Sequence, residues 1–183
     1  MIKLASSGYK ASGKRWYGVD PNAIVYPHVS SCVTVTCVTP AGLAGLHLAY
    51  VLSQEETRAD LATFAPCAEG ATSLYVIGVL GAWVPGGKNR TGLHYQGQGG
   101  GTLIERLREA TGYGGVVQTC DTQAFSSEVR LRATLTRGVA TFTWEVHAAP
   151  NPLPVTHFEH VAGNVMFTPR APGNAGCAGC VIF

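Results

Sequence analysis

The stretch VSSCVTVTCVTPAGLAGLHLAYV, residues 29–51, has the pattern of two β-strands joined by a tight turn. Valine and threonine alternate after Cys32, which is typical of a half-buried strand. The sequence TPAG, residues 39–42, has turn chemistry, with proline at its second position. The returning strand carries His47. The stretch therefore predicts a β-hairpin that starts at a cysteine and returns through a histidine.

Two registers of this hairpin fit the turn, and both put Cys32 and His47 on one face of the sheet. A two-residue turn sets Thr34 opposite His47, whereas a four-residue loop sets Cys32 opposite His47. Because alternate residues of a strand point the same way, the two side chains are diagonal or direct neighbours. A slip of one residue would separate them. We expect their face to be the smaller and more polar one, with room for a substrate.

The rest of the chain alternates helix and strand patterns. The sequences SQEE (53–56) and TLIE (102–105) are capping boxes that predict the starts of two helices, the second ending at Gly112. Strand-like runs follow each helix, and the last two join at a tight turn over residues 137–138. The order β-β-α-β-α-β-β-β predicts an α/β (α+β) fold, a mixed, largely antiparallel β-sheet or sandwich flanked by two helices.

Composition and length favour one domain over residues 1–183. We expect a polar, irregular N-terminal arm (1–21), a core (22–147) and a proline-rich C-terminal extension (148–183). Thirteen basic and 11 acidic residues give a net charge of +2, and scattered cations argue against a nucleic-acid partner. No secretory signal or transmembrane run stands out, and the six cysteines are expected to be thiols.

The segment Val29-Ser30-Ser31-Cys32, followed by His47, resembles the active-site segment of a superfamily of cysteine-dependent protein glutamine deamidases. Its members include the CheD chemoreceptor deamidases, the catalytic domain of cytotoxic necrotizing factor and the Burkholderia lethal factor. The succession of helices and strands over about residues 22–147 is also similar. The resemblance implies a deamidase-like fold. Two positions depart from the family pattern: Tyr26 stands where members often carry threonine, and Ser31 replaces glycine.

The resemblance implies a hydrolase that acts on carboxamide C–N bonds without a metal or cofactor. The thiolate of Cys32 would attack a glutamine side chain of a protein substrate, assisted by His47. Backbone N–H groups near Ser30 and Ser31 would hold the oxyanion. Tyr26, through its hydroxyl or its carbonyl, would take the third catalytic role of orienting the histidine.

Three functions remain open at this point. The first is a toxin or effector, secreted by a specialised system into a host cytosol, where it converts a glutamine of a small GTPase or translation factor to glutamate. The second is a chemoreceptor deamidase of the bacterial cytoplasm, and the third is an inactive binding module with the same fold. The C-terminal CVIF predicts prenylation of Cys180, with Cys177 as a second acylation site and membrane association as the result. We expect a monomer.

Overall fold

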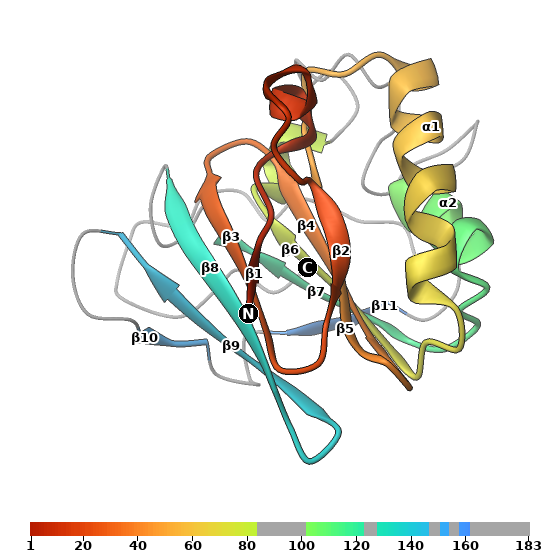
Figure 1. The fold of residues 1–183 in the computed structure, drawn as a ribbon, viewed down its shortest axis with the longest axis vertical. Helices are drawn as coiled ribbons and strands as arrows, with labels where there is room; N and C mark the ends of the chain where they lie inside the picture. Colours follow the sequence, from red (N-terminus) through yellow and green to blue (C-terminus); the bar gives the residue numbers. More distant parts are fainter. Residues whose placement is uncertain (84–101, 123–127, 147–150, 154–157, 162–183) are drawn as a thin grey trace.

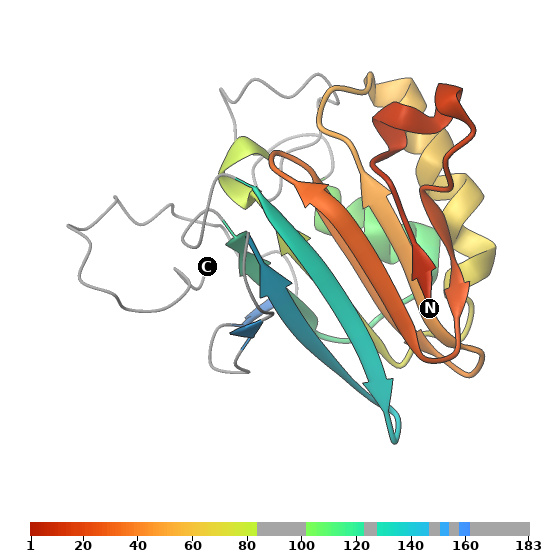
Figure 2. The same cartoon turned by 60° about the vertical axis from the view of Figure 1, so that its left-hand side comes forward.

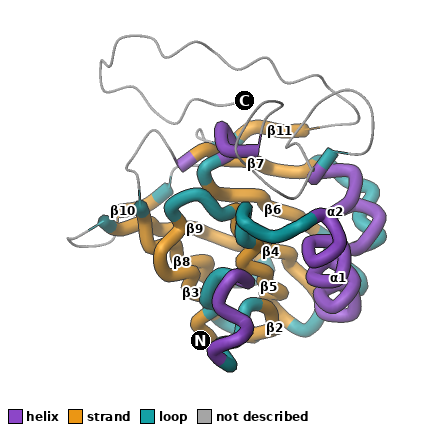
Figure 3. Tube along the Cα trace, turned by 90° about the horizontal axis from the view of Figure 1, so that it is seen from above, coloured by secondary structure: helices purple, strands orange, loops and turns teal. Residues whose placement is uncertain are grey.

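The computed structural model describes residues 1–83, 102–122, 128–146, 151–153 and 158–161. Within these ranges the fold is mixed α+β, with two sheets of mostly antiparallel strands and two α-helices (Figure 1). The helices lie on one side of the six-stranded sheet, and the five-stranded sheet lies on its other side (Figures 1 and 3). The predicted α+β class is confirmed.

The elements have the following bounds. The five-stranded sheet has the order β1-β3-β8-β9-β10 and is built from β1 (Ile2–Lys3), β3 (Ala23–Val29), β8 (Val129–Thr136), β9 (Val139–Glu145) and β10 (Asn151–Pro152). The six-stranded sheet has the order β11-β7-β6-β4-β5-β2 and is built from β2 (Tyr17–Asp20), β4 (Val33–Thr39), β5 (Gly42–Leu48), β6 (Ser73–Gly78), β7 (Val117–Asp121) and β11 (Glu159–Val161). The helices are α1 (Gln54–Phe64), α2 (Leu103–Thr111) and the short 3₁₀ helices η1 (Ser7–Ser12), η2 (Ala65–Ala68) and η3 (Leu80–Trp83).

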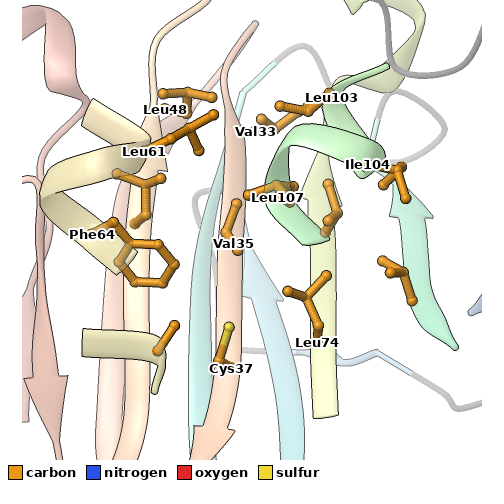
Figure 4. Packing of buried hydrophobic residues seen from close by; sticks show 14 of the residues in the cluster. Val33, Val35, Cys37, Leu48, Leu61, Phe64, Leu74, Leu103, Ile104 and Leu107 are labelled. Atoms are coloured by element: carbon orange, nitrogen blue, oxygen red, sulfur yellow. The ribbon is translucent and has the colours of Figure 1, made fainter. Parts of the chain in front are cut away.

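The helices bury the aliphatic face of the six-stranded sheet. Val33 and Val35 of β4 pack against Leu61 and Phe64 of α1 and against Leu107 of α2 (Figure 4). Both predicted capping boxes are present, and α2 ends at Gly112 in the left-handed conformation, so the predicted helix starts and the second helix end are confirmed.

The second core lies between the two sheets. Tyr26 and Ile24 of β3 face β5, where Gly45 leaves the space for them. A Cβ at Gly45 would lie within 2.8 Å of Tyr26 Oη, Ile24 Cδ1 and Leu4 Cδ1, so no larger residue fits without a shift. At this position, large side chains of β3 therefore pack against a glycine of β5.

The hairpin of residues 29–51 has the two-residue-turn register. Thr39 pairs with Gly42 and Thr34 pairs with His47. The hairpin of β8 and β9 turns at Arg137 and Gly138, which both have positive φ, as a type I′ turn requires. The predicted turns at both places are confirmed.

The N-terminal segment, residues 1–20, is not the irregular arm that its polar sequence predicts. It adds β1 to the edge of one sheet and β2 to the edge of the other, with η1 between them (Figure 2). Leu4 is fully buried between the sheets. The error has a physical reason: β2 pairs with β5, and strand pairing across such a separation leaves little trace in local sequence.

Of the predicted C-terminal extension, the described part contributes β10 and β11, and it buries Leu153 and Phe158 in the inter-sheet core. The remainder of residues 148–183 lies outside the described residues, as does the glycine-rich stretch 85–101.

Candidate active site

Cys32 lies at the crossover between the two sheets. Strand β3 of the five-stranded sheet ends at Val29, and strand β4 of the six-stranded sheet begins at Val33. The side chain of Cys32 is 6% exposed and packs on Ala49 and Leu52. The chain crossover thus places the thiol at the rim of the two main cores, in a small cluster of its own.

Gly78 allows β6 to approach the backbone of Cys32. The carbonyl of Cys32 accepts a hydrogen bond from the N–H of Val79 at 3.2 Å. A Cβ at Gly78 would collide with this same carbonyl oxygen and with the Cα of Val33. The position of the cysteine backbone thus depends on a glycine on the neighbouring strand.

His47 is fully buried on β5 and is held by one ring nitrogen. Its Nδ1 lies 2.8 Å from the carbonyl oxygen of Leu4. Because a carbonyl only accepts, Nδ1 carries the proton, and in the neutral ring Nε2 is the acceptor. Nε2 is buried and has no hydrogen-bond partner among the described residues. Most buried polar atoms have a hydrogen-bond partner, so an unsatisfied Nε2 is unusual and indicates a candidate functional group.

Cys32 and His47 lie on the same face of the six-stranded sheet, as the sequence predicted. Thr34 pairs with His47, and Cys32 stands immediately before the first residue of β4. Cys32 packs on Ala49, which follows His47 by two residues. Within the described residues, no hydrogen bond joins the sulfur to the imidazole in this resting structure. Such contacts are often long before a substrate binds.

The prediction that this face is open to a substrate is wrong. The five-stranded sheet covers it, and His47 contacts the ring of Tyr26 edge-on, with centroids 5.9 Å apart. The polar residues of this face predict room for a substrate, whereas in the structure they make hydrogen bonds in the interior: the Thr34 hydroxyl donates to the carbonyl of Ile77.

The N-terminal segment supplies four contacts to this pair and its surroundings. The Leu4 carbonyl accepts from Nδ1 of His47, and the Trp16 carbonyl accepts from its backbone N–H at 2.8 Å. Ser6 Oγ lies 3.3 Å from Cys32 Sγ, within hydrogen-bond distance. The Ser7 hydroxyl accepts from the N–H of Ala49, which packs on Cys32, at 2.9 Å. The site is therefore closed by residues that precede Cys32 by 16 or more positions.

Tyr26 does not have the orienting role predicted for it. Its hydroxyl donates to the carbonyl of Val35 at 3.0 Å and lies 2.7 Å from Thr36 Oγ1. Burial raises the pKa of this phenol far above its ordinary value. The acceptor that orients His47 is the carbonyl of Leu4 instead.

The serines before Cys32 differ in their surroundings. Ser30 is exposed, whereas Ser31 is half-buried and its carbonyl accepts from the indole N–H of Trp83 at 3.1 Å. The backbone N–H and hydroxyl of Ser31 both favour a negative charge on the sulfur of Cys32. Both donors of Ser31 therefore act on the sulfur of Cys32.

Burial keeps both reactive groups neutral at rest. It raises the pKa of the Cys32 thiol, against the opposing hydrogen bonds of Ser6, the Tyr50 N–H and Ser31. Burial also lowers the pKa of His47 to about 4, with the Leu4 hydrogen bond opposing it and the charge of nearby His28 adding to it. Burial thus favours the protonated thiol of Cys32 and the neutral imidazole of His47.

No protein-family model, curated protein or solved structure matches this chain. Among the residues that the structure describes, no group of three or more His, Cys, Asp or Glu side chains is placed to hold a metal ion. Within the same ranges, neither helix has the length and apolar character needed to cross a membrane. The predicted lipidation residues Cys177 and Cys180 lie outside the described residues.

Sequence reasoning missed the groups that complete the site. Leu4, Ser6, Ser7 and Trp16 have no motif of their own, and two of them act through backbone carbonyls that every residue has. Their contacts span 26 residues for Ser6 with Cys32 and 43 for Leu4 with His47. The sequence signal for these contacts was weak: two adjacent serines, Ser6 and Ser7, close to a leucine in an otherwise polar segment.

Proposed function

We propose that this protein is a cysteine-dependent protein glutamine deamidase with a fold related to the CheD and cytotoxic necrotizing factor superfamily. The observation that carries the proposal is the state of His47. Its Nδ1 donates its proton to the carbonyl of Leu4, and its buried Nε2 has no partner among the described residues. Cys32 stands just before β4, the strand that pairs with the strand of His47. A neutral imidazole with one unprotonated ring nitrogen is what a general base needs in order to take the proton of a nucleophile.

The reaction begins from the neutral pair. Nε2 of His47 takes the thiol proton as the sulfur of Cys32 attacks the carboxamide carbon, which forms a tetrahedral oxyanion. The imidazolium then returns the proton to the departing nitrogen, ammonia leaves, and a thioester remains. Water, deprotonated by His47, hydrolyses the thioester to the glutamate carboxylate and restores the thiol. One glutamine side chain and one water thus give one glutamate and one ammonia, without a cofactor.

Hydrogen-bond donors around the sulfur support this chemistry. Ser6 Oγ lies 3.3 Å from the sulfur, and donors of Ser31 and Tyr50 favour its charged form. A donor that stabilises a transition-state oxyanion is worth about 10²–10³ in rate. In this proposal Ser6 stabilises the thiolate as it forms, and the N–H of Ser31 is the first candidate for the oxyanion.

The inactive binding module is the second candidate, and the burial of Cys32 favours it. A thiol that is 6% exposed, with a pKa raised by burial, is the usual state of a structural cysteine. A deamidase of this kind requires the rim of the sandwich around Cys32 to open for substrate. A small alkylating reagent discriminates the two functions, because the enzyme labels at Cys32 and the inert module labels only at half-buried Cys67 among the described thiols.

The substrate class and the location belong to the same proposal. The substrate is a glutamine in a protein, such as a host small GTPase or translation factor, and the chain acts as a secreted effector, attached to membranes if Cys180 is prenylated. A CheD-type chemoreceptor deamidase of the bacterial cytoplasm is the alternative within the same chemistry. Assays of glutamine conversion in host lysate and in bacterial lysate, run in parallel, distinguish the effector from the chemoreceptor deamidase.

Proteome-wide mass spectrometry tests the activity. Lysate treated with the wild type should contain a peptide with a glutamine-to-glutamate conversion that is lost with Cys32→Ser and with His47→Ala. Cys67→Ser is the matched control, because it removes a thiol elsewhere and should leave the conversion intact. Conversion by folded Cys32→Ser at the wild-type rate would exclude the proposed mechanism, and no conversion by any form would favour the inactive module.

A further inference from the structure

A groove crosses the outer face of the five-stranded sheet, on the side away from the six-stranded sheet. It has a volume of about 360 Å³. Its centre is one row of paired residues across four strands: Lys3 pairs with Val25, Val25 with Arg132, and Arg132 with Thr143. Residues that pair directly point to the same face, so two long cations flank a floor of smaller side chains.

The next row of the groove contains one ion pair. Arg130 donates to the carboxylate of Glu145 at 2.8 Å, and the two residues pair across β8 and β9. Lys3 and Arg132 are exposed and have no ion-pair partner among the described residues. Two positive charges in the groove are therefore uncompensated.

The groove accounts for the whole positive excess of the protein. The chain has 13 basic and 11 acidic residues; without Lys3, Arg130, Arg132 and Glu145, ten of each remain. Charges of one sign gathered in a concave surface focus the field and attract ligands of the other sign. The formal charges of the remaining residues cancel.

We propose that this groove binds an extended acidic segment of a partner protein. Lys3 and Arg132 stand two strand spacings apart, roughly 10 Å between their Cα atoms, which suits two carboxylates along a chain better than one phosphate. Two cations are too few for nucleic acid, because the affinity for nucleic acid rises with the number of phosphates that the protein neutralises. They are also too few for an anionic membrane, which is typically bound by clusters of about four to eight Lys or Arg residues.

The inference goes beyond the deamidase proposal, because the groove lies on the opposite side of the five-stranded sheet from Cys32 and His47. Binding to it needs no catalysis. An active-site variant such as Cys32→Ser should bind the acidic segment as the wild type does, so the two proposals fail separately.

The test measures binding of a fluorescent oligoglutamate peptide by polarisation, with an oligoglutamine peptide as the uncharged comparison. We expect the oligoglutamate alone to bind, and Lys3→Gln with Arg132→Gln to weaken it about ten-fold or more. The matched control, Lys14→Gln with Arg58→Gln, removes the same charge from exposed residues outside the groove and should change binding by less than about two-fold. Glu145→Gln removes the one carboxylate and frees Arg130, so it should tighten binding.

Three results would overturn the inference. Equal weakening by the control pair would mean that net charge, not the groove, attracts the peptide. Weaker binding by Glu145→Gln would contradict the assigned site. Displacement of the peptide by inorganic phosphate at matched charge would assign the groove to small anions instead of a protein segment.

Discussion

The Nδ1 of His47 donates to the carbonyl oxygen of Leu4 at 2.8 Å, across 43 residues of sequence. This bond fixes the tautomer of a fully buried imidazole and leaves Nε2 as an acceptor that no residue of the described ranges satisfies. The N-terminal segment is therefore part of the candidate site, and its removal or displacement would release the histidine. The predictions below follow from this contact and its neighbours.

His47 should make the stability of the protein depend on pH between its folded and unfolded pKa values. Burial lowers the folded pKa to about 4 from 6.5, so the unfolded chain binds the proton more readily in this window. The unfolding free energy should fall as pH drops from 6.5 towards 4, by at most about 3 kcal/mol from this group. Denaturant titrations at a series of pH values measure it.

The comparison for this experiment is His47→Asn, which keeps a donor for Leu4 and has no proton to take up. Other carboxylates titrate in the same window, so the difference between the two proteins is the quantity of interest. Parallel pH profiles would contradict the burial of a neutral imidazole.

Ser6→Ala should make Cys32 less reactive without unfolding the protein. The Ser6 hydroxyl lowers the thiol pKa, against the larger effect of burial, so its loss should raise that pKa further. Loss of one hydrogen bond to a charged group predicts alkylation of Cys32 about ten-fold slower at a fixed neutral pH. The pH dependence of the alkylation rate shows whether the thiol pKa has changed. Ser12→Ala, at the last residue of the 3₁₀ helix that Ser6 precedes, is the control.

Gly78→Ala should destabilise the protein, because the new methyl group has no room beside the carbonyl of Cys32. Forcing a methyl group into a packed position typically costs about 1–3 kcal/mol. Thermal unfolding measures the loss. Gly114→Ala is the matched control, since a Cβ there meets nothing within 4 Å, and an equal loss in both variants would show that the crowding at Gly78 is not the cause.

Lys10→Met should loosen the N-terminal segment. Lys10 Nζ lies 2.6 Å from Oδ1 of Asp60, a carboxylate that is almost fully buried on α1. Its loss leaves this charge unpaired, which should cost about 1–3 kcal/mol after allowance for the partial exposure of Lys10. Amide hydrogen exchange should speed up at Ser6 and Ser7. Lys14→Met, an exposed lysine of the same segment, should leave the exchange unchanged.

The local elements of this protein follow from short-range sequence patterns. Capping boxes located both helix starts, and strand alternation predicted one face for Cys32 and His47 in either of two registers, of which the structure has the two-residue turn. These features depend on residues within a few positions of one another, where backbone geometry and side-chain caps leave a legible pattern.

Which element covers that face, and which group accepts the hydrogen bond of His47, depends on tertiary packing. The polar hairpin face is compatible with solvent or with a second sheet, and the choice depends on Tyr26 finding space over Gly45. The carbonyl of Leu4 could not be predicted as the partner of His47, because a backbone acceptor has no residue type. Contacts between distant segments are fixed when the two sheets pack, and the burial of a neutral imidazole and a protonated thiol follows from that packing.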